Sequence, residues 1–159
     1  MHSEYHIRYG GYGGIAYHQV FDKYIPLFTH LITSGVWEAV YILDGLLKNI
    51  SDIQPDTLYG DTQGQSAPVF AISYLLGIKL MRRIRNWKDC DFLGPTADKT
   101  YDYIDPLFKG VVNWNLIQTH WHDMMRIVFS IKAGKVMPST LLRKLGSYSG
   151  KNPLYQAFQ

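Results

Sequence analysis

The stretch Thr57-Leu-Tyr-Gly-Asp-Thr-Gln-Gly-Gln65 decides the predicted fold. A short apolar run ends at Gly60 and is followed by one carboxylate, Asp61, and then by a polar turn that contains glycine. A new apolar segment begins near Pro68. This order predicts a strand, a loop and a helix. Asp61 would then stand at the end of the strand, where a rigid scaffold can position a metal ligand.

Towards the amino terminus, the pattern predicts three antiparallel strands followed by a helix. Residues 5–9, 15–21 and 23–32 have extended character. The glycines between residues 10 and 14 predict the first turn, because that many glycines are costly inside a strand. Ser34 can cap a helix whose apolar residues follow at near-helical spacing to about Asn49.

Towards the carboxyl terminus, residues 69–78 are predicted to form a helix and residues 79–84 a strand. After Trp87 the pattern changes, Gly94-Pro95 breaks the chain, and helices are predicted over residues 98–109, 113–132 and 138–146. Residues 151–159 look like the start of a further helix. The predicted class is therefore α/β, in the order three strands, helix, strand, helix, strand, with a helical part from about residue 88.

Composition limits the class of protein. The chain has 159 residues, of which 47% are hydrophobic and 18% charged, and this fits one globular domain rather than a disordered chain. No apolar run approaches the roughly 20 residues that span a bilayer, and the amino terminus has no signal-peptide pattern. A single cysteine, Cys90, cannot form an internal disulfide. These features predict a cytoplasmic protein without membrane contact.

Charge is unevenly distributed along the chain. Residues 1–78 carry a net charge of −4 and residues 79–159 a net charge of +7. A basic half favours an anionic partner such as nucleic acid, although a solvated surface explains it equally well. The densest basic run consists of Arg82, Arg83, Arg85 and Lys88. Phosphate contact is favoured over an edge strand kept soluble by charge, because Asp61 is expected on a neighbouring strand.

Three patterns in the sequence are candidate functional sites. The glycines at 10–14 fit neither the dinucleotide-binding nor the P-loop pattern, so a hairpin turn is favoured. His120 and His122 would point to different faces of a helix, which favours surface or packing roles over metal binding. Asp61 alone cannot build a two-metal site. From the residues alone, an aspartate in such a loop is more often a turn former than a ligand.

Longer matches identify a family. The chain closely resembles the transposase of the Tn-three family of replicative, cointegrate-forming transposons. The matching segments, in the family's order, are Arg8-Tyr-Gly-Gly-Tyr-Gly-Gly-Ile-Ala-Tyr17, Gly35-Val-Trp-Glu-Ala-Val-Tyr-Ile42, Asp61-Thr-Gln-Gly-Gln65, Arg83-Ile-Arg-Asn-Trp-Lys88 and Lys151-Asn-Pro-Leu-Tyr-Gln-Ala-Phe158. They are spread over nearly the whole chain and are highly specific together.

The resemblance implies an RNase H-like (retroviral-integrase-like) catalytic domain with an Asp-Asp-Glu triad. Its fold is a mixed sheet flanked by helices, with a helical insertion. Asp61 matches the second aspartate, which coordinates catalytic Mg²⁺, with Mn²⁺ as a substitute. The implied parts are an incomplete core (1–87), a helical insertion subdomain (88–150) and the truncated start of a further helix (151–159). The other two triad carboxylates would lie outside this chain, so neither Glu4 nor Glu38 is assigned a role.

The resemblance also implies a function. The parent enzyme would cut transposon ends and join the 3′-hydroxyls to target DNA, as a homodimer acting on terminal inverted repeats in the bacterial cytoplasm, at the nucleoid. Gln63 and Gln65 would bond backbone phosphates or hold their loop, and Arg82, Arg83, Arg85 and Lys88 are candidate DNA contacts. The isolated chain is expected to be inactive. Two alternatives remain, a non-catalytic DNA-binding or regulatory remnant and a decayed gene fragment.

Overall fold

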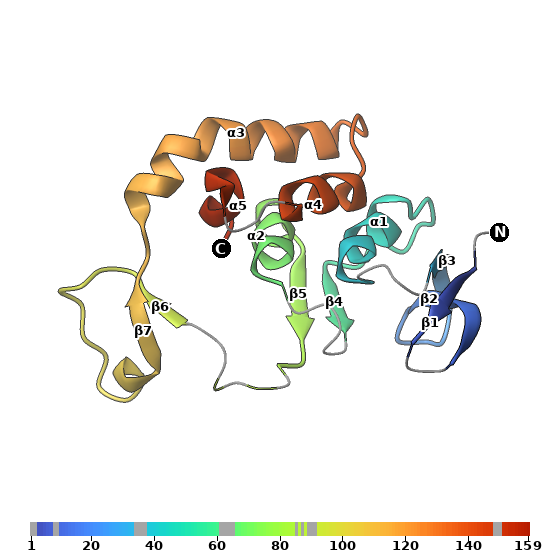
Figure 1. Cartoon of the computed structure of the whole chain (residues 1–159), viewed down its shortest axis with the longest axis horizontal. Coiled ribbons are helices and arrows are strands. Elements are labelled where there is room, and N and C mark those ends of the chain that lie inside the picture. Colours follow the sequence, from blue (N-terminus) through green and yellow to red (C-terminus); the bar gives the residue numbers. More distant parts are fainter. Residues whose placement is uncertain are drawn as a thin grey trace.

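The computed structural model describes residues 3–7, 10–33, 38–60, 66–84, 86, 88, 92–147 and 151–159. The described part mixes helices with three small sheets, and this confirms the α/β class (Figure 1). The sheets have the strand orders β1-β2-β3, β4-β5 and β6-β7. Within the described residues the antiparallel strands and the β4-β5 pair are separate sheets, whereas the sequence predicted one mixed sheet.

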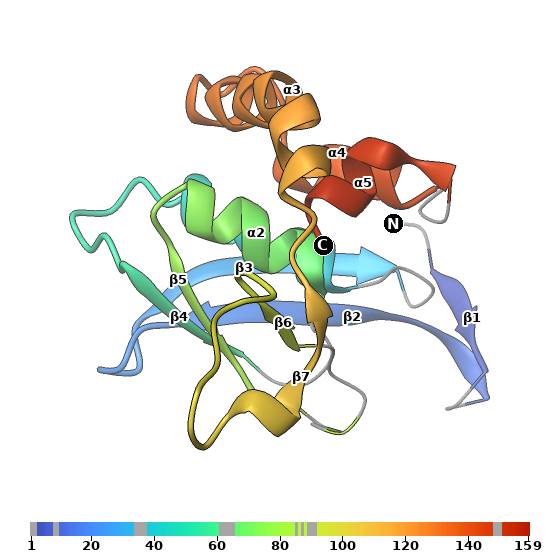
Figure 2. The same cartoon turned by 90° about the vertical axis from the view of Figure 1, so that its left-hand side faces the viewer.

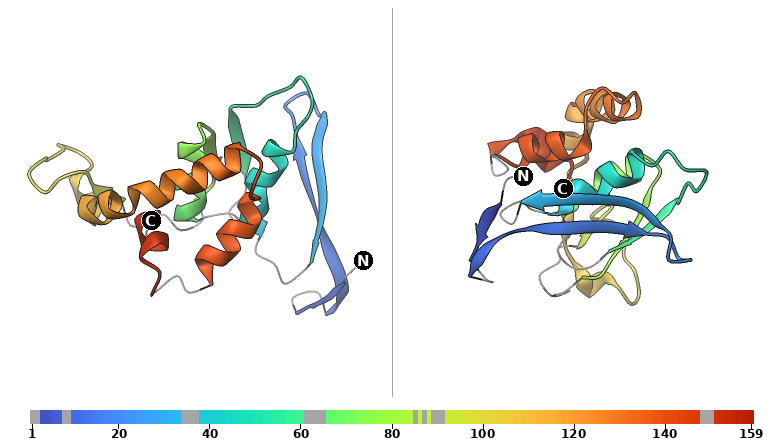
Figure 3. Two further views of the ribbon diagram at one scale, coloured as in Figure 1. Left: turned by 90° about the horizontal axis from the view of Figure 1, so that it is seen from above. Right: turned by 90° about the vertical axis from the view of Figure 1, so that its right-hand side faces the viewer.

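The amino-terminal sheet is the predicted antiparallel meander. It consists of β1 (Glu4–His6), β2 (Gly11–Val20) and β3 (Pro26–Thr33), and the last two form a long ribbon (Figure 3). The turn predicted at glycines 10–14 is wrong for most of that run. Gly10 has a φ of +63° and belongs to the turn, but Gly11, Gly13 and Gly14 lie within β2. Pairing with β1 and β3 on its two edges offsets the entropic cost of these glycines.

Within the described residues, the first helical segment ends at Leu47, slightly before the predicted Asn49. It consists of the 3₁₀ helix η1 (Glu38–Tyr41) and α1 (Ile42–Leu47), and the predicted cap, Ser34, lies outside the described residues. Every residue from Ile42 to Leu46 is buried. This burial explains why such a short helix is stable, because packing rather than propensity supplies most helical stability.

The predicted strand, helix and strand around Asp61 are confirmed with shifted ends. They are β4 (Thr57–Gly60), α2 (Ala67–Leu75) and β5 (Lys79–Arg82). The helix starts two residues before the predicted residue 69, since Pro68 suits the first turn of a helix. It also ends earlier, because Gly77 adopts a φ of +83° that ends the helix and turns the chain into β5.

The helix predicted over residues 98–109 is wrong. Most of this region is turn and irregular chain, ending in the 3₁₀ helix η4 (Asp105–Leu107) and in β7 (Phe108–Val111). Pro106 has no amide hydrogen to donate inside an α-helix. The strand β7 pairs in parallel with β6 (Phe92–Gly94), and the two form an arm that leads up to the start of α3 (Trp114–Lys132) (Figure 1).

The remaining helices agree with the sequence. They are α3 (Trp114–Lys132), α4 (Pro138–Gly146) and the short α5 (Pro153–Ala157). Asn113 caps α3 by accepting a hydrogen bond from the amide of Leu116 at 3.0 Å, as expected for an asparagine at this position. In Figure 1, α3 lies above α4 and α5.

One hydrophobic core joins the two halves of the chain. Its buried residues come from η1, α1, α2, α3, α4 and the carboxyl-terminal end, and they are Ala39, Val40, Ile42, Leu43, Val69, Ile72, Met124, Ile131, Leu142, Leu145, Ala157 and Phe158. Buried polar side chains are paired within it: Gln19 donates from Nε2 to the carbonyl of Ile42 at 2.7 Å. None of the helices in the described part has the length and apolar character to cross a membrane.

Candidate active site

The carboxyl ends of β4 and β5 lie side by side at one edge of their sheet (Figure 2). The two strands run parallel, with Thr57 opposite Lys79 and Gly60 opposite Arg82. The amide of Arg83 extends the pairing by donating to the carbonyl of Gly60 at 3.2 Å. Open α/β sheets bind ligands beyond the carboxyl ends of their parallel strands. This edge is therefore the candidate active site.

Packing beneath the edge holds the two strands in place. Leu58 of β4 and Leu80 of β5 pack against the hydrophobic core. The helix α2, which connects the two strands in sequence, is buried at Val69, Ile72 and Ser73. The Ser73 hydroxyl donates to the carbonyl of Val69 at 2.6 Å. Packing against the core thus fixes the carboxyl ends of β4 and β5. The segments that follow these strands in the chain begin at the edge of the core.

Four predicted site residues, Asp61, Gln63, Gln65 and Arg85, lie outside the described residues. The structure describes the elements on either side of residues 61–65, since β4 ends at Gly60 and α2 begins at Ala67. Asp61 therefore directly follows the carboxyl end of β4, a strand that the sequence predicted, and the structure adds that β4 pairs in parallel with β5. The roles assigned to these four side chains remain predictions.

Arg82 is a predicted phosphate contact whose side chain lies beside Gly60, the last residue of β4. Its side chain is half-buried and lies on the backbone of Gly60. A Cβ atom on Gly60 would stand 2.8 Å from both Cζ and Nη2 of Arg82. The structure thus brings the guanidinium group of Arg82 beside the residue that precedes Asp61. This relationship was not predicted, because it depends on the register between two strands.

Arg83 and Lys88 are both exposed. Lys88 leads towards the arm, because its carbonyl accepts a hydrogen bond from Nζ of Lys109 on β7 at 2.9 Å. The structure therefore adds Lys109 to the candidate cationic residues. The two residues are 21 positions apart, and nothing in the sequence indicated this contact.

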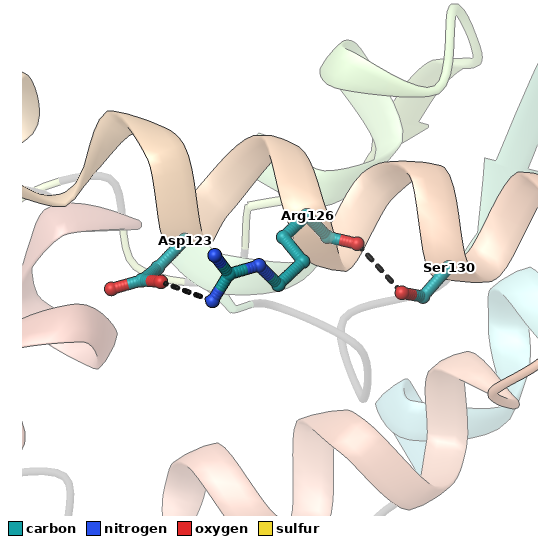
Figure 4. Close-up of polar contacts among 3 residues, drawn as sticks. All are labelled: Asp123, Arg126 and Ser130. Carbon is teal, nitrogen blue, oxygen red and sulfur yellow. Dashed lines mark hydrogen bonds and ion pairs between the residues drawn. The ribbon is translucent and has the colours of Figure 1, made fainter.

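Another exposed cation has a partner on its own helix. Nη1 of Arg126 lies 3.2 Å from Oδ1 of Asp123, and the carbonyl of Arg126 accepts a hydrogen bond from the Ser130 hydroxyl at 2.7 Å (Figure 4). Both charged side chains are largely exposed. For this part of the basic half, a solvated surface explains the charge without any anionic partner.

A metal site is not complete within the described residues. No three His, Cys, Asp or Glu side chains among them come together in a way that could hold a metal ion. His120 and His122 lie on α3, as predicted, and belong to no such group. Mg²⁺ prefers six oxygen ligands, including carboxylates. The described donors therefore do not fit a complete Mg²⁺ site.

One groove in the described part of the chain was not predicted from the sequence. It is a groove of about 840 Å³ whose walls come from α2, β6, β7, α3 and the carboxyl-terminal residues. Apolar side chains such as Phe70, Leu93 and Leu116 line it, and no charged side chain is found among the described residues of its wall. A groove of this kind does not suit a phosphate, so the candidate site stays at the carboxyl edge of β4 and β5.

Comparison with known proteins decides the family. Residues 1–159 match the family described as the Tn3 transposase DDE domain. The chain belongs to the Tn3 transposase family. This confirms the resemblance to the Tn-three family, and with it the assignment of the chain as a transposase fragment. No solved structure matches the chain.

Several curated Tn3-family transposases are similar over nearly the whole chain. The transposase of transposon Tn501 from Pseudomonas aeruginosa is 38% identical over 147 residues, which are 92% of this chain and 15% of that protein. The transposase of Tn21 from Escherichia coli is 37% identical over the same shares. The transposase of Tn1546 from Enterococcus faecium is 32% identical over the full chain and 16% of its own length. The chain therefore spans about 15% of the relatives it matches.

Proposed function

We propose that this chain supplies the Asp61-bearing part of the catalytic domain of a DNA transposase. The parent enzyme cuts the ends of a transposable element and joins the freed 3′-hydroxyls to target DNA by metal-dependent phosphoryl transfer. The observation that carries the proposal is the family match over residues 1–159, together with the place of Asp61 directly after a parallel strand.

The finer fold that we propose is RNase H-like. In support, an antiparallel meander is followed by a helix, a strand, a helix and a parallel strand. Beyond its contact with β1, the edge of β2 opposite β3 has no partner in the described residues, and neither has the edge of β4 opposite β5. The two sheets lie on neighbouring sides of α1 (Figures 1 and 3). One additional strand pairing with both edges would join them into a mixed sheet.

The proposed division of the chain follows the same resemblance. Residues 1–87 form an incomplete core, residues 88–150 an insertion subdomain and residues 151–159 the start of a further helix. The insertion holds α3 and α4, but it also holds the parallel strands β6 and β7. It shares its apolar core with η1, α1 and α2, so we expect it to fold together with residues 38–75 rather than alone.

The metal that we propose for the complete enzyme is Mg²⁺, with Mn²⁺ as a substitute. Two-metal sites place a pair of cations about 4 Å apart between several ligands. Asp61 would be one ligand, with the remaining carboxylates supplied by other parts of the enzyme. Because one carboxylate is too few, the isolated chain is proposed to be inactive in strand cleavage and transfer.

The proposed partner is double-stranded DNA, both transposon terminal inverted repeats and target. In support, Arg82 is the last residue of β5, and the exposed Arg83 and Lys88 follow it in the chain. Gln63, Gln65 and Arg85 would add contacts from the adjoining segments. A homodimer of the full-length enzyme in the bacterial cytoplasm, at the nucleoid, completes the proposal.

Exchange of the matching segment tests the catalytic proposal. The 147 residues of the Tn501 transposase that align with this chain would be replaced by this chain, and transposition would be counted in cells. We expect transposition by the exchanged protein and its loss on Asp61→Asn. The matched control is Asp56→Asn, which removes an exposed carboxylate from the loop before β4. Equal activity of the Asp61 variant and its parent would refute the assignment.

Exposed cations favour a second candidate function, DNA binding without catalysis. Arg83, Lys88 and Lys109 are all exposed in the described part of the chain. On this proposal the isolated chain binds a DNA duplex, Asp61→Ala leaves the affinity unchanged, and combined replacement of Arg82, Arg83 and Arg85 by alanine weakens it. The affinity should fall steeply with salt concentration, because phosphate contacts release counterions.

A further inference from the structure

Gly60 and Arg82 are the last residues of β4 and β5 and stand opposite each other in the parallel register. Paired residues of neighbouring strands direct their side chains to the same face of the sheet. On this face Leu58 and Leu80 pack against the core one step earlier along the strands. The guanidinium group of Arg82 thus follows an apolar layer and lies at the edge that the chain leaves towards Asp61.

Gly60 matters here for the space that it leaves to Arg82 rather than for its backbone angles. The described glycines with a positive φ are Gly10, Gly77 and Gly134, and Gly60 is not among them. A Cβ atom at residue 60 would lie 2.8 to 3.0 Å from Cζ, Nη2 and Nε of Arg82, so the guanidinium group would have to move aside. Glycine within a strand often marks the close approach of another group, and here that group is the arginine fork.

Packing against Gly60 distinguishes Arg82 from its neighbour in sequence. Arg82 is half-buried, whereas Arg83 is exposed. A guanidinium group held in place loses less conformational entropy when it binds, and its planar fork matches a phosphate. Arg82 is therefore prepared for phosphate binding before any ligand arrives.

We propose that the guanidinium group of Arg82 rests on Gly60, which we call its seat. In this position the group binds one phosphate of the DNA backbone at the carboxyl edge of β4 and β5. This contact positions the DNA strand at the carboxyl end of β4, the strand that Asp61 follows in sequence. Arg82 is then a positioning residue, and Gly60 controls where its fork lies. The inference rests on the proposed function only in requiring that the chain binds DNA.

Fluorescence anisotropy with a labelled duplex of random sequence, measured over a series of salt concentrations, tests the proposal. Arg82→Ala should weaken binding by about tenfold at low salt and lower the slope of log affinity against log salt by about one. Gly60→Ala should have a similar effect, because the new methyl group displaces the fork. Arg82→Lys should keep the salt slope but lose part of the affinity, since it keeps the charge without the fork.

The double variant separates a coupled pair from two independent effects. If Gly60 acts only through Arg82, Gly60→Ala combined with Arg82→Ala should bind like Arg82→Ala alone. This variant also has no clash, so it replaces Gly60→Ala if that variant fails to fold by circular dichroism. Additive losses would overturn the role of Gly60 as the seat.

Two controls match the substitutions. Gly11→Ala adds a methyl group within a strand where no atom lies within 4 Å, and it should bind like the unmodified chain. Lys79→Ala removes a cation from the opposite end of β5 and should keep more affinity than Arg82→Ala. If the unmodified chain does not bind DNA, the proposed DNA partner fails together with this inference. If the chain binds DNA and Arg82→Ala binds within twofold of it, only the inference fails.

Discussion

The carboxylate of Asp44 in α1 accepts two hydrogen bonds from Ser139, the second residue of α4. One comes from the backbone amide at 2.9 Å and the other from the hydroxyl at 2.6 Å. Asp44 is 3% exposed and Ser139 is 4% exposed. The carboxylate thereby accepts a hydrogen bond from an amide at the amino terminus of α4 that has no partner within the helix. Its negative charge also interacts favourably with the positive end of the helix dipole. Two helices far apart in sequence are joined at this point.

Loss of the Asp44 carboxylate should destabilise the fold. Asp44→Ala leaves the buried amide and hydroxyl of Ser139 without their acceptor, at a cost of about 3 kcal/mol in the free energy of unfolding. Asp44→Asn keeps one oxygen acceptor and should cost less. Urea unfolding of the isolated chain measures both variants. The control is Asp123→Ala in the exposed pair with Arg126, which should change stability by less than about 1 kcal/mol.

A methyl group on Gly45 should destabilise the chain although alanine favours helices. Gly45 lies within α1, and a Cβ atom there would come within 2.5 Å of Cδ of the buried Gln19. Gly45→Ala should therefore cost about 1–3 kcal/mol, because Gln19 must leave its hydrogen bond to Ile42.

Gly146→Ala is the matched control for Gly45. Gly146 is the last residue of α4, and no atom lies within 4 Å of an added Cβ. Alanine here should raise the stability by roughly 0.5–1 kcal/mol, from helix propensity alone. Equal effects of the two substitutions would show that Gln19 does not restrict residue 45.

The isolated chain should neither bind Mg²⁺ measurably nor cut DNA. Incubation with a transposon-end duplex and Mn²⁺ should leave the duplex intact, because Asp61 alone supplies too few ligands. Adding Mg²⁺ should not raise the melting temperature, since only a ligand that binds the folded state stabilises it. Clean cleavage that disappears on Asp61→Ala would contradict this prediction.

The arm formed by β6 and β7 should loosen when Trp114 loses its hydrogen bond. The indole Nε1 of Trp114 donates to the carbonyl of Pro95 at 2.7 Å and ties the start of α3 to the residue after β6. Trp114→Phe keeps an aromatic ring but removes the donor, at a cost of about 1 kcal/mol. Hydrogen exchange should become faster in residues 92–111 and stay unchanged in α4. Unchanged exchange in the arm would show that the bond does not restrain it.

Local sequence patterns were sufficient to predict the helices and strands whose ends depend on residues close in sequence. The ends of α3 and α4 agree with the prediction because Asn113 and Pro138 mark where these helices begin. The strand before Asp61 was predicted from a short apolar run that ends in glycine. The place of Asp61 at the end of a strand is the part of the candidate site that sequence alone could predict.

The failures share a different cause, which is pairing between separate segments of the chain. Gly11 and Gly13 lie in a strand because His6 and Glu4 pair with them. Residues 108–111 form a strand because β6 pairs with them in parallel. The seating of Arg82 on Gly60 likewise requires the register of β4 and β5. No periodicity within one segment reports such a register.

The shared core has a consequence for synthesis of the chain on the ribosome. Its buried residues lie either between Ala39 and Ile72 or between Met124 and Phe158. The early apolar surface therefore stays uncovered until the second group has been translated, an interval on the order of several seconds at usual elongation rates. During that time the nascent polypeptide exposes an aggregation-prone apolar surface. A chaperone that covers this surface would raise the yield of folded protein.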